Sequence, residues 1–143
     1  MSGSVRVRFP DGTTVTGSPR SAQEGRTARF DFGLYMHDAW DPSWDYERID
    51  WPDFELPENS KAAAASIEVA FVRARSGEAV EVGCDGGLGR TGTVLACMAI
   101  LAGVEPEQAV AWIRVHYRAE AVETEAQADW VDWFGRRAPT GDD

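Results

Sequence analysis

The chain has 143 residues, which is long enough for one domain with its own core, so we expect a single domain over residues 1–143. It carries 24 acidic and 14 basic residues and a formal net charge of −10. This acidity argues against nucleic acid and against an anionic membrane surface as partners. An anionic substrate would therefore have to be attracted by a local positive field.

We predict that the two cysteines, Cys84 and Cys97, are both free thiols. Cys97 falls about two turns into a helix that Cys84 precedes, so a bridge between them is sterically disfavoured. Free thiols indicate a reducing compartment. Arg6 and Arg8 interrupt the N-terminus without a following signal-like apolar segment, and the longest uncharged apolar stretch, 91–104, is too short to span a bilayer. We therefore expect a cytoplasmic protein.

Arginine is strongly preferred over lysine, because Lys61 is the only lysine among 14 basic residues. This preference is typical of a GC-rich bacterial genome, so we expect a bacterial source.

The chain begins with a predicted β-hairpin. Its first strand is indicated by the alternation of Val5, Val7 and Phe9 with polar residues. A Pro-Asp-Gly turn follows, and residues 13–16 would form the second strand of the hairpin. Residues 17–25 indicate a polar loop.

A second strand is predicted over residues 30–36, with Gly33 at a bulge. Residues 38–50 form a long connection that contains Trp40 and Trp44. These rings either cap the edge of the core or take part in binding, since loops carry many binding residues. Any short strand in this connection would cover residues 46–51.

The second half of the chain predicts helices. A start signal at residues 56–60 and a stop at Gly77 bound the first. Residues 91–102 are apolar nearly all round, which predicts a central, buried helix. A third helix starts at Pro106.

Thr124 opens the last helix, because Thr-x-x-Gln is the pattern of a capping box. Gln127 shares one helical face with Trp130, Val131 and Phe134, so its polar side chain points inward, where it needs a partner.

The most informative stretch is residues 80–93, VEVGCDGGLGRTGT. It predicts a buried strand, a glycine-rich turn and a helix start, an arrangement that directs amide groups and the positive end of a helix at one point and so attracts anions. Such a point favours the thiolate of Cys84. Arg90 adds a planar fork of donors that suits two oxygens of a phosphate.

Other motifs fit this stretch less well. Gly87, Gly89 and Gly92 spell G-x-G-x-x-G, but no second strand ending in an acid follows the helix, as a dinucleotide fold requires. A Walker loop needs a glycine and a lysine where Cys84 and Arg90 stand.

Cys-x5-Arg-Thr after a strand, with Trp51-Pro52-Asp53 upstream, resembles the cysteine-dependent protein tyrosine phosphatases, including the dual-specificity group. The resemblance covers roughly residues 51–127. It implies an α/β fold with a small central mixed sheet flanked by helices, here with an N-terminal β-hairpin. The low-molecular-weight phosphatases have the acid after the cysteine, so their chain order fits less well.

The resemblance also implies roles for individual residues. Cys84 would be the nucleophile, Asp53 the general acid, and Thr91 a hydroxyl that stabilises the departing sulfur. Gln127 would orient the hydrolytic water. No metal or cofactor is implied. Phosphate would be bound by the guanidinium of Arg90 and by the backbone amides of Asp85, Gly86, Gly87, Leu88, Gly89 and Arg90.

Three simpler interpretations remain open. Asp53 would be a surface acid in a turn, Gln127 only a helix cap, and Thr91 only a residue near a helix start. Gly83 departs from the family, which usually has histidine immediately before the cysteine.

The implied substrate is a phosphorylated protein or peptide, foremost phosphotyrosine, hydrolysed by a monomer through a cysteinyl-phosphate. One alternative is a phosphate-binding module without turnover. Another is a phosphoinositide or small-molecule phosphatase, although the loop offers Asp85 and no lysine to a polyanionic head group.

Overall fold

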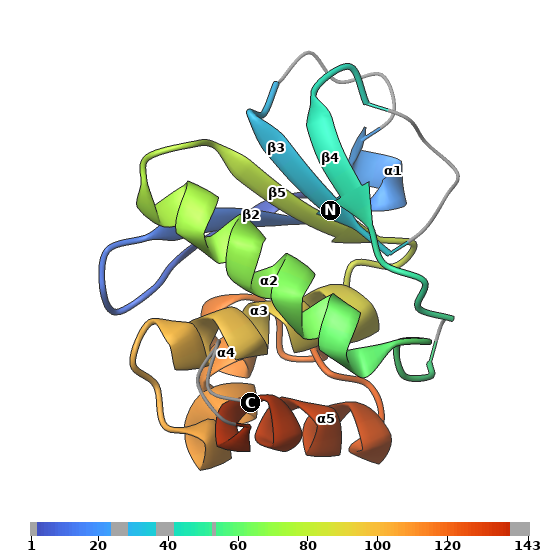
Figure 1. Ribbon diagram of the computed structural model, residues 1–143, viewed down its shortest axis with the longest axis vertical. Coiled ribbons are helices and arrows are strands. Elements are labelled where there is room, and N and C mark those ends of the chain that lie inside the picture. The colour runs from blue at the N-terminus through green and yellow to red at the C-terminus, as the bar shows by residue number, and fades with distance from the viewer. Residues whose placement is uncertain (1–2, 24–28, 37–41, 53, 138–143) are drawn as a thin grey trace.

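The computed structural model describes residues 3–23, 29–36, 42–52 and 54–137, and Figure 1 shows their arrangement. A five-stranded sheet has the order β1-β2-β5-β3-β4. β1 and β2 are antiparallel, and every other neighbouring pair is parallel, so the predicted mixed sheet is confirmed. The strands are β1 (Val5–Arg8), β2 (Thr14–Pro19), β3 (Phe32–Tyr35), β4 (Asp45–Arg48) and β5 (Val80–Cys84).

Helices α2 to α5 form two layers on one side of this sheet, and α1 lies apart from them (Figure 1). α2 and α3 lie against the strands, and α4 and α5 pack on α3. A 3₁₀ turn, η1 (Pro106–Gln108), leads into α4. The helices are α1 (Arg20–Gln23), α2 (Ser60–Arg75), α3 (Gly89–Leu101), α4 (Ala109–His116) and α5 (Glu125–Arg136).

The predicted hairpin is confirmed, but the polar loop over residues 17–25 is wrong. β2 continues to Pro19 and α1 begins at Arg20. The reason is long-range pairing, because the end of β2 lies parallel to β5 and has its backbone groups satisfied there. Ser18 is buried in this pairing and donates to Glu81 at 2.6 Å.

Gly33 makes no bulge, contrary to prediction, since β3 pairs in continuous register with both neighbours. The ring of Tyr35 lies over Gly33 so closely that an added Cβ would stand 2.3 Å from it. The glycine therefore makes room for a ring. β4 begins at Asp45, one residue before the predicted range.

Trp44 packs at the edge of the sheet, as one of the two interpretations of the aromatic connection predicted. Its ring meets Phe30 edge-on at 5.7 Å, and its Nε1 donates to the hydroxyl of Tyr35 at 3.1 Å. Trp40 and His37 lie outside the described residues.

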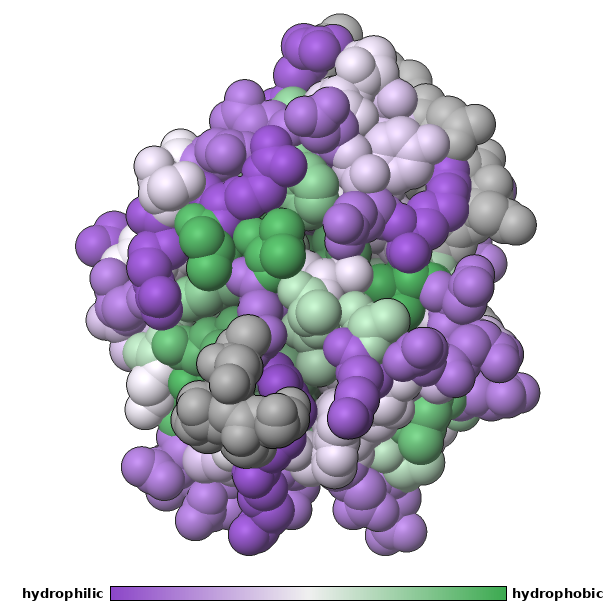
Figure 2. Space-filling model, in the orientation of Figure 1, coloured by the Kyte–Doolittle hydropathy of each residue, from purple (hydrophilic) through white to green (hydrophobic). Residues whose placement is uncertain are grey.

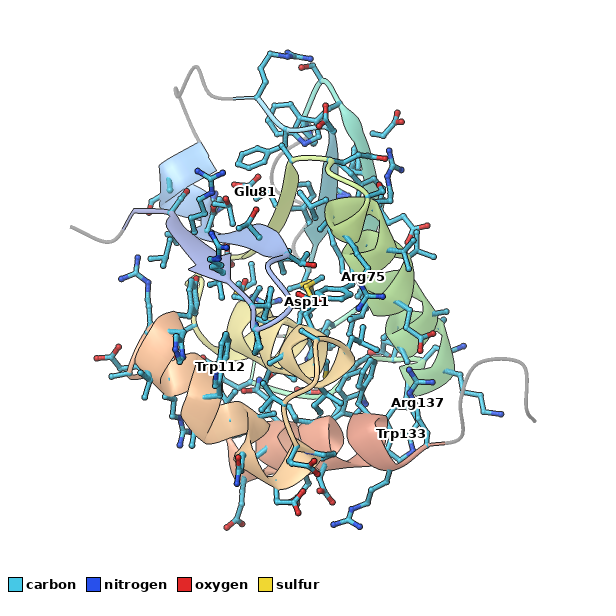
Figure 3. The ribbon with its side chains drawn as sticks, turned by 90° about the vertical axis from the view of Figure 1, so that its left-hand side faces the viewer. Asp11, Arg75, Glu81, Trp112, Trp133 and Arg137 are labelled. Atoms are coloured by element: carbon cyan, nitrogen blue, oxygen red, sulfur yellow. The ribbon has the colours of Figure 1, made fainter. Side chains whose placement is uncertain are left out.

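α2 starts where the sequence predicts, because the side chain of Asn59 accepts a hydrogen bond from the amide of Ala62 at 3.0 Å. At its other end Arg75 faces Asp11 in the hairpin turn at 3.3 Å (Figure 3). Figure 2 shows apolar side chains in the middle of the face that carries α2, with hydrophilic ones around them, and Val69 and Val72 of α2 are exposed.

α3 is buried along most of its length, as predicted, and both cysteines are free. It begins two residues earlier than predicted, at Gly89, because Gly92 already donates to the carbonyl of Leu88 at 2.9 Å. The glycine loop thus leads directly into the helix.

Candidate active site

Cys84 is the last residue of β5, the central strand, and its side chain is buried beneath the glycine loop. Its Sγ accepts two hydrogen bonds, one from the amide of Gly87 at 3.2 Å and one from the hydroxyl of Thr91 at 3.0 Å. Hydrogen bonds to a sulfur favour its charged form. The predicted partnership of Cys84 and Thr91 is therefore present in space.

The loop between Cys84 and α3 is shaped by Gly87. Its φ is +73°, a conformation that side chains rarely adopt, and an added Cβ would stand 2.7 Å from the backbone nitrogen of Pro19. Asp85 is held by Arg20, the residue that follows Pro19. Its carboxylate pairs with the Arg20 side chain at 2.9 Å, and its carbonyl accepts a hydrogen bond from the Arg20 amide at 3.0 Å. The end of β2 thus braces the loop.

Arg90 lies in the first turn of α3 and is buried. Its Nη1 donates to the carbonyls of Met36 at 2.7 Å and Trp51 at 2.8 Å. These bonds connect the start of α3 to the end of β3 and to the Trp-Pro-Asp segment. The two parts of the predicted site are therefore in direct contact.

Trp51 anchors the Trp-Pro-Asp segment in the core. Its ring is buried, lies 5.4 Å from that of Trp130, and donates through Nε1 to the carbonyl of Glu55 at 2.8 Å. Phe54 adopts φ of 63°, so the chain turns sharply there. Asp53 lies outside the described residues, and its role stays a prediction.

Gln127 is buried in the first turn of α5, where both bonds of the predicted capping box are present. Its Oε1 accepts from the amides of Thr124 at 3.3 Å and Glu123 at 2.9 Å. Its Nε2 is buried and has no hydrogen-bond partner among the described residues. A buried donor of this kind needs a partner, such as a water or substrate oxygen.

Gln127 also adjoins the glycine loop. An added Cβ on Gly89 would stand 3.2 Å from Oε1 of Gln127. The preceding segment docks on α3, since the amide of Val122 donates to the carbonyl of Leu88 at 3.2 Å and Gly92 leaves room for Ala121. The structure therefore brings together Cys84, Arg90, Thr91 and Gln127.

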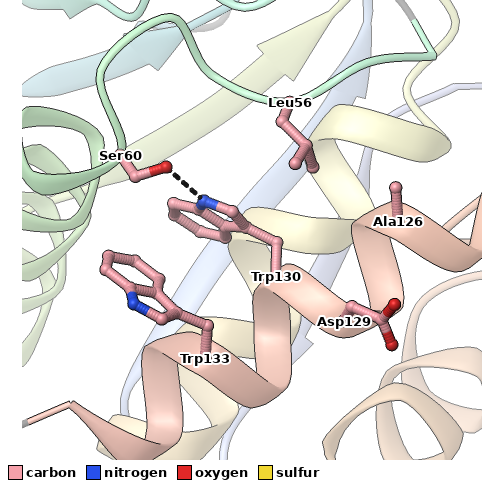
Figure 4. Close-up of a pocket in the computed structure, with 6 residues that line it drawn as sticks. All are labelled: Leu56, Ser60, Ala126, Asp129, Trp130 and Trp133. Atoms are coloured by element: carbon pink, nitrogen blue, oxygen red, sulfur yellow. Dashed lines mark hydrogen bonds between the residues drawn. The ribbon is translucent and has the colours of Figure 1, made fainter.

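A pocket of about 410 Å³ lies between α5 and the segment that follows the Trp-Pro-Asp triplet (Figure 4). Trp130 forms part of it and donates through Nε1 to the hydroxyl of Ser60 at 2.9 Å. Its lining residues are Leu56, Ser60, Ala126, Asp129, Trp130 and Trp133.

Two residues near the loop were not identified from the sequence. Glu81 is fully buried in β5 (Figure 3) and accepts hydrogen bonds from Ser18 at 2.6 Å and Tyr35 at 2.7 Å. Tyr117 reaches the loop itself, donating to the carbonyl of Gly87 at 2.5 Å. A glutamate in an otherwise apolar strand was the one available signal, and Tyr117 gave none beyond its apolar helical spacing.

Among the described residues, no group of three or more His, Cys, Asp or Glu side chains could hold a metal ion. His116 is exposed, and its ring stacks on that of Trp112 at 3.9 Å.

Within the residues that the structure describes, no helix has the length and apolar character needed to cross a membrane.

Several solved structures have this fold. Tk-PTP in its active form superposes with a TM-score of 0.69 and 23% identity, over 92% of this chain and 97% of that chain. DUSP15 gives a TM-score of 0.74 and 16% identity, over 95% and 89%. The arrangement of sheet and helices is thus the one found in tyrosine and dual-specificity phosphatases.

The family follows from the sequence itself. Residues 51–131, more than half of the chain, match the family described as "PTP-SAK: Swiss Army Knife protein, DSP-PTPase phosphatase domain". The chain belongs to this family of phosphatase domains. A curated relative, "Uncharacterized protein MJECL20" of Methanocaldococcus jannaschii, is 50% identical over 56 residues, which cover 39% of this chain and 37% of that protein. The matched region is therefore little more than a third of that relative.

Proposed function

We propose that the chain hydrolyses phosphate monoesters of phosphoproteins, foremost phosphotyrosine, through a cysteinyl-phosphate. The observation that carries this proposal is the sulfur of Cys84, which accepts hydrogen bonds from Gly87 and Thr91 at the start of α3. A sulfur held by an amide, a hydroxyl and a helix N-terminus is favoured as a nucleophile.

In the first step the thiolate of Cys84 attacks phosphorus, and the bond from phosphorus to the substrate oxygen breaks. Asp53 gives its proton to that departing oxygen. The loop amides and the guanidinium of Arg90 stabilise the negative charge that spreads over the remaining phosphoryl oxygens.

In the second step water attacks the cysteinyl-phosphate, and the bond from sulfur to phosphorus breaks. Asp53 takes the proton from that water, which Gln127 orients through its Nε2. Thr91 donates to the sulfur as it leaves, at the distance of 3.0 Å that it already has. The products are inorganic phosphate and the regenerated thiolate.

A single phosphate is favoured over a phosphoinositide head group, because Asp85 puts a carboxylate at the loop and Arg20 already pairs with it. The experiment is to measure turnover of phosphotyrosine and phosphoserine peptides, a phosphoinositide and an aryl phosphate by the wild-type protein and by Cys84→Ser. We expect turnover of phosphotyrosine that Cys84→Ser abolishes, with the fold and phosphate binding retained.

Other results would redirect this proposal. Preference for the phosphoinositide would replace the substrate class. Phosphate binding without turnover by the wild-type protein would indicate a binding module. Activity of Cys84→Ser within about tenfold of wild type would refute the nucleophile, since a hydroxyl is a far weaker nucleophile than a thiolate.

A further inference from the structure

Tyr117 connects the last turn of α4 to the glycine loop. It caps α4 and is 7% exposed, and its hydroxyl donates to the carbonyl of Gly87 at 2.5 Å. Its ring lies close to Gly17, where an added Cβ would stand 2.7 Å from the ring. The phenol is therefore fixed by packing before it reaches the loop.

Gly87 is the residue through which the loop contacts the sulfur. Its amide donates to Sγ of Cys84 at 3.2 Å while its carbonyl accepts from Tyr117. A trans peptide is planar and its C=O and N–H point in opposite directions. Because the carbonyl of Gly87 points to Tyr117, the amide of Leu88 points away from Tyr117.

Arg20 and Pro19 brace the loop at Asp85 and at Gly87, but neither of these contacts involves the carbonyl of Gly87. Asp85 and Gly86 are exposed, and an added Cβ on Gly86 would meet nothing within 4 Å. The glycines themselves permit several backbone conformations. A loop that binds an anion through amides must keep its carbonyls turned outward, since an inward carbonyl would repel the anion.

We propose that Tyr117 is a positioning residue, whose hydroxyl holds the carbonyl of Gly87 outward and so keeps the loop in its phosphate-binding form. This role rests on the proposed function. Without the hydroxyl, the peptide that follows Gly87 can rotate and place an oxygen where phosphate or thiolate charge would lie. Tyr117 acts through the loop and does not contact substrate.

Tyr117 keeps its proton over the whole neutral range. Burial, followed by negative charge on the sulfur of Cys84, raises the pKa of Tyr117 to about 12. Negative charge on Glu81 also raises this pKa, whereas Arg118 lowers it. The phenol is thus a donor at every pH at which the loop would bind phosphate.

The test compares wild type with Tyr117→Phe, which keeps the ring and removes the hydroxyl. Two quantities are measured: the affinity for inorganic phosphate, and the pH at which iodoacetamide alkylates Cys84 at half its maximal rate. We expect phosphate affinity to fall about tenfold and the alkylation midpoint to rise by roughly half to one pH unit, as the loss of one hydrogen bond allows. Tyr46→Phe, on the edge strand β4, is the matched control and should change neither.

Unchanged phosphate affinity and an unchanged midpoint in folded Tyr117→Phe would overturn the inference and leave the proposed function standing. A wild-type protein that hydrolyses no monoester would refute the proposed function, and alkylation would still test the hold of Tyr117 on the loop. If Tyr117→Phe does not fold, exchange of the Tyr117 hydroxyl proton in the wild type decides, because that proton forms the proposed hydrogen bond to Gly87. It should exchange with solvent much more slowly than the hydroxyl proton of Tyr46, and equally fast exchange of the two would refute the inference.

Discussion

Arg90 donates through Nη1 to the carbonyl of Trp51 at 2.8 Å, so the residue predicted to hold phosphate also holds the segment predicted to carry the acid. The same nitrogen reaches the carbonyl of Met36 at 2.7 Å. A guanidinium has five donors in a fixed plane, so it can bind two carbonyls and still offer donors to a ligand. One side chain thus couples the position of the acid segment to that of the loop.

Arg90→Lys should therefore lose more than charge. An ammonium group is a point charge that cannot serve both carbonyls and two phosphate oxygens in one plane. We expect a loss of turnover of about 10² to 10³-fold, the cost of removing a preorganised donor. Steady-state kinetics with a phosphotyrosine peptide checks this, with Arg136→Lys on the surface of α5 as the control. Near-normal turnover by Arg90→Lys would show that positive charge alone is sufficient.

Asp53→Asn should slow poor leaving groups most, because only these need a proton as the bond breaks. General acid catalysis is worth about 10² to 10⁴-fold. The measurement is kcat/KM against the leaving-group pKa for a series of aryl phosphates, together with its pH profile. Loss of the alkaline limb is expected. An equal loss for good and poor leaving groups with the limb retained would mean that Asp53 is a turn residue only.

Gln127→Ala separates a catalytic role from a structural one. The substitution removes a capping acceptor and also the buried Nε2, whereas Thr124→Ala removes the other half of the same capping box. Both should lose about 1 kcal/mol of stability. Only Gln127→Ala should slow breakdown of the intermediate, seen as a burst of the first product followed by a reduced steady rate. Equal kinetics in the two variants would leave Gln127 a cap.

The local parts of this molecule could be predicted from the sequence. The capping box at Thr124 and the buried face of α5 depend on residues within two turns of each other. The approach of Arg90 to the Trp-Pro-Asp segment was predictable only through the family resemblance, since the two are far apart in the chain and the bond runs to a backbone carbonyl.

Features that depend on distant pairing were not predictable. Residues 17–19 look polar and irregular, but they form a strand because β5 lies beside them. The role of Gly33 was missed although Tyr35 is only two residues away, because the sequence does not show that the ring of Tyr35 lies over Gly33 while its hydroxyl donates to Glu81 of β5. Glu81 can be buried because the hydroxyls of Ser18 in β2 and Tyr35 in β3 donate hydrogen bonds to its carboxylate. This arrangement needs three strands side by side, so it cannot be predicted from any one segment.

Tyr117 should also make the fold sensitive to alkaline pH. Its pKa is about 12 in the folded protein, chiefly through burial, against an ordinary value of 10.0. The folded state therefore holds the proton more tightly than the unfolded state. This stabilisation is complete below about pH 10 and is lost as the pH rises from there through about 12.

The measurement is urea unfolding of wild type and Tyr117→Phe at about pH 8 and about pH 11. With a raised pKa of this size, the phenol of Tyr117 should cost the wild type about 1.4 kcal/mol of stability between these pH values, a loss that the variant does not share. Burial also raises the pKa of Cys97, but Cys97 is present in both proteins, so its effect cancels in the difference. An equal decline in the two proteins would show that the phenol ionises as readily in the fold as in the unfolded chain, and the buried hydrogen bond to Gly87 would then not form in solution.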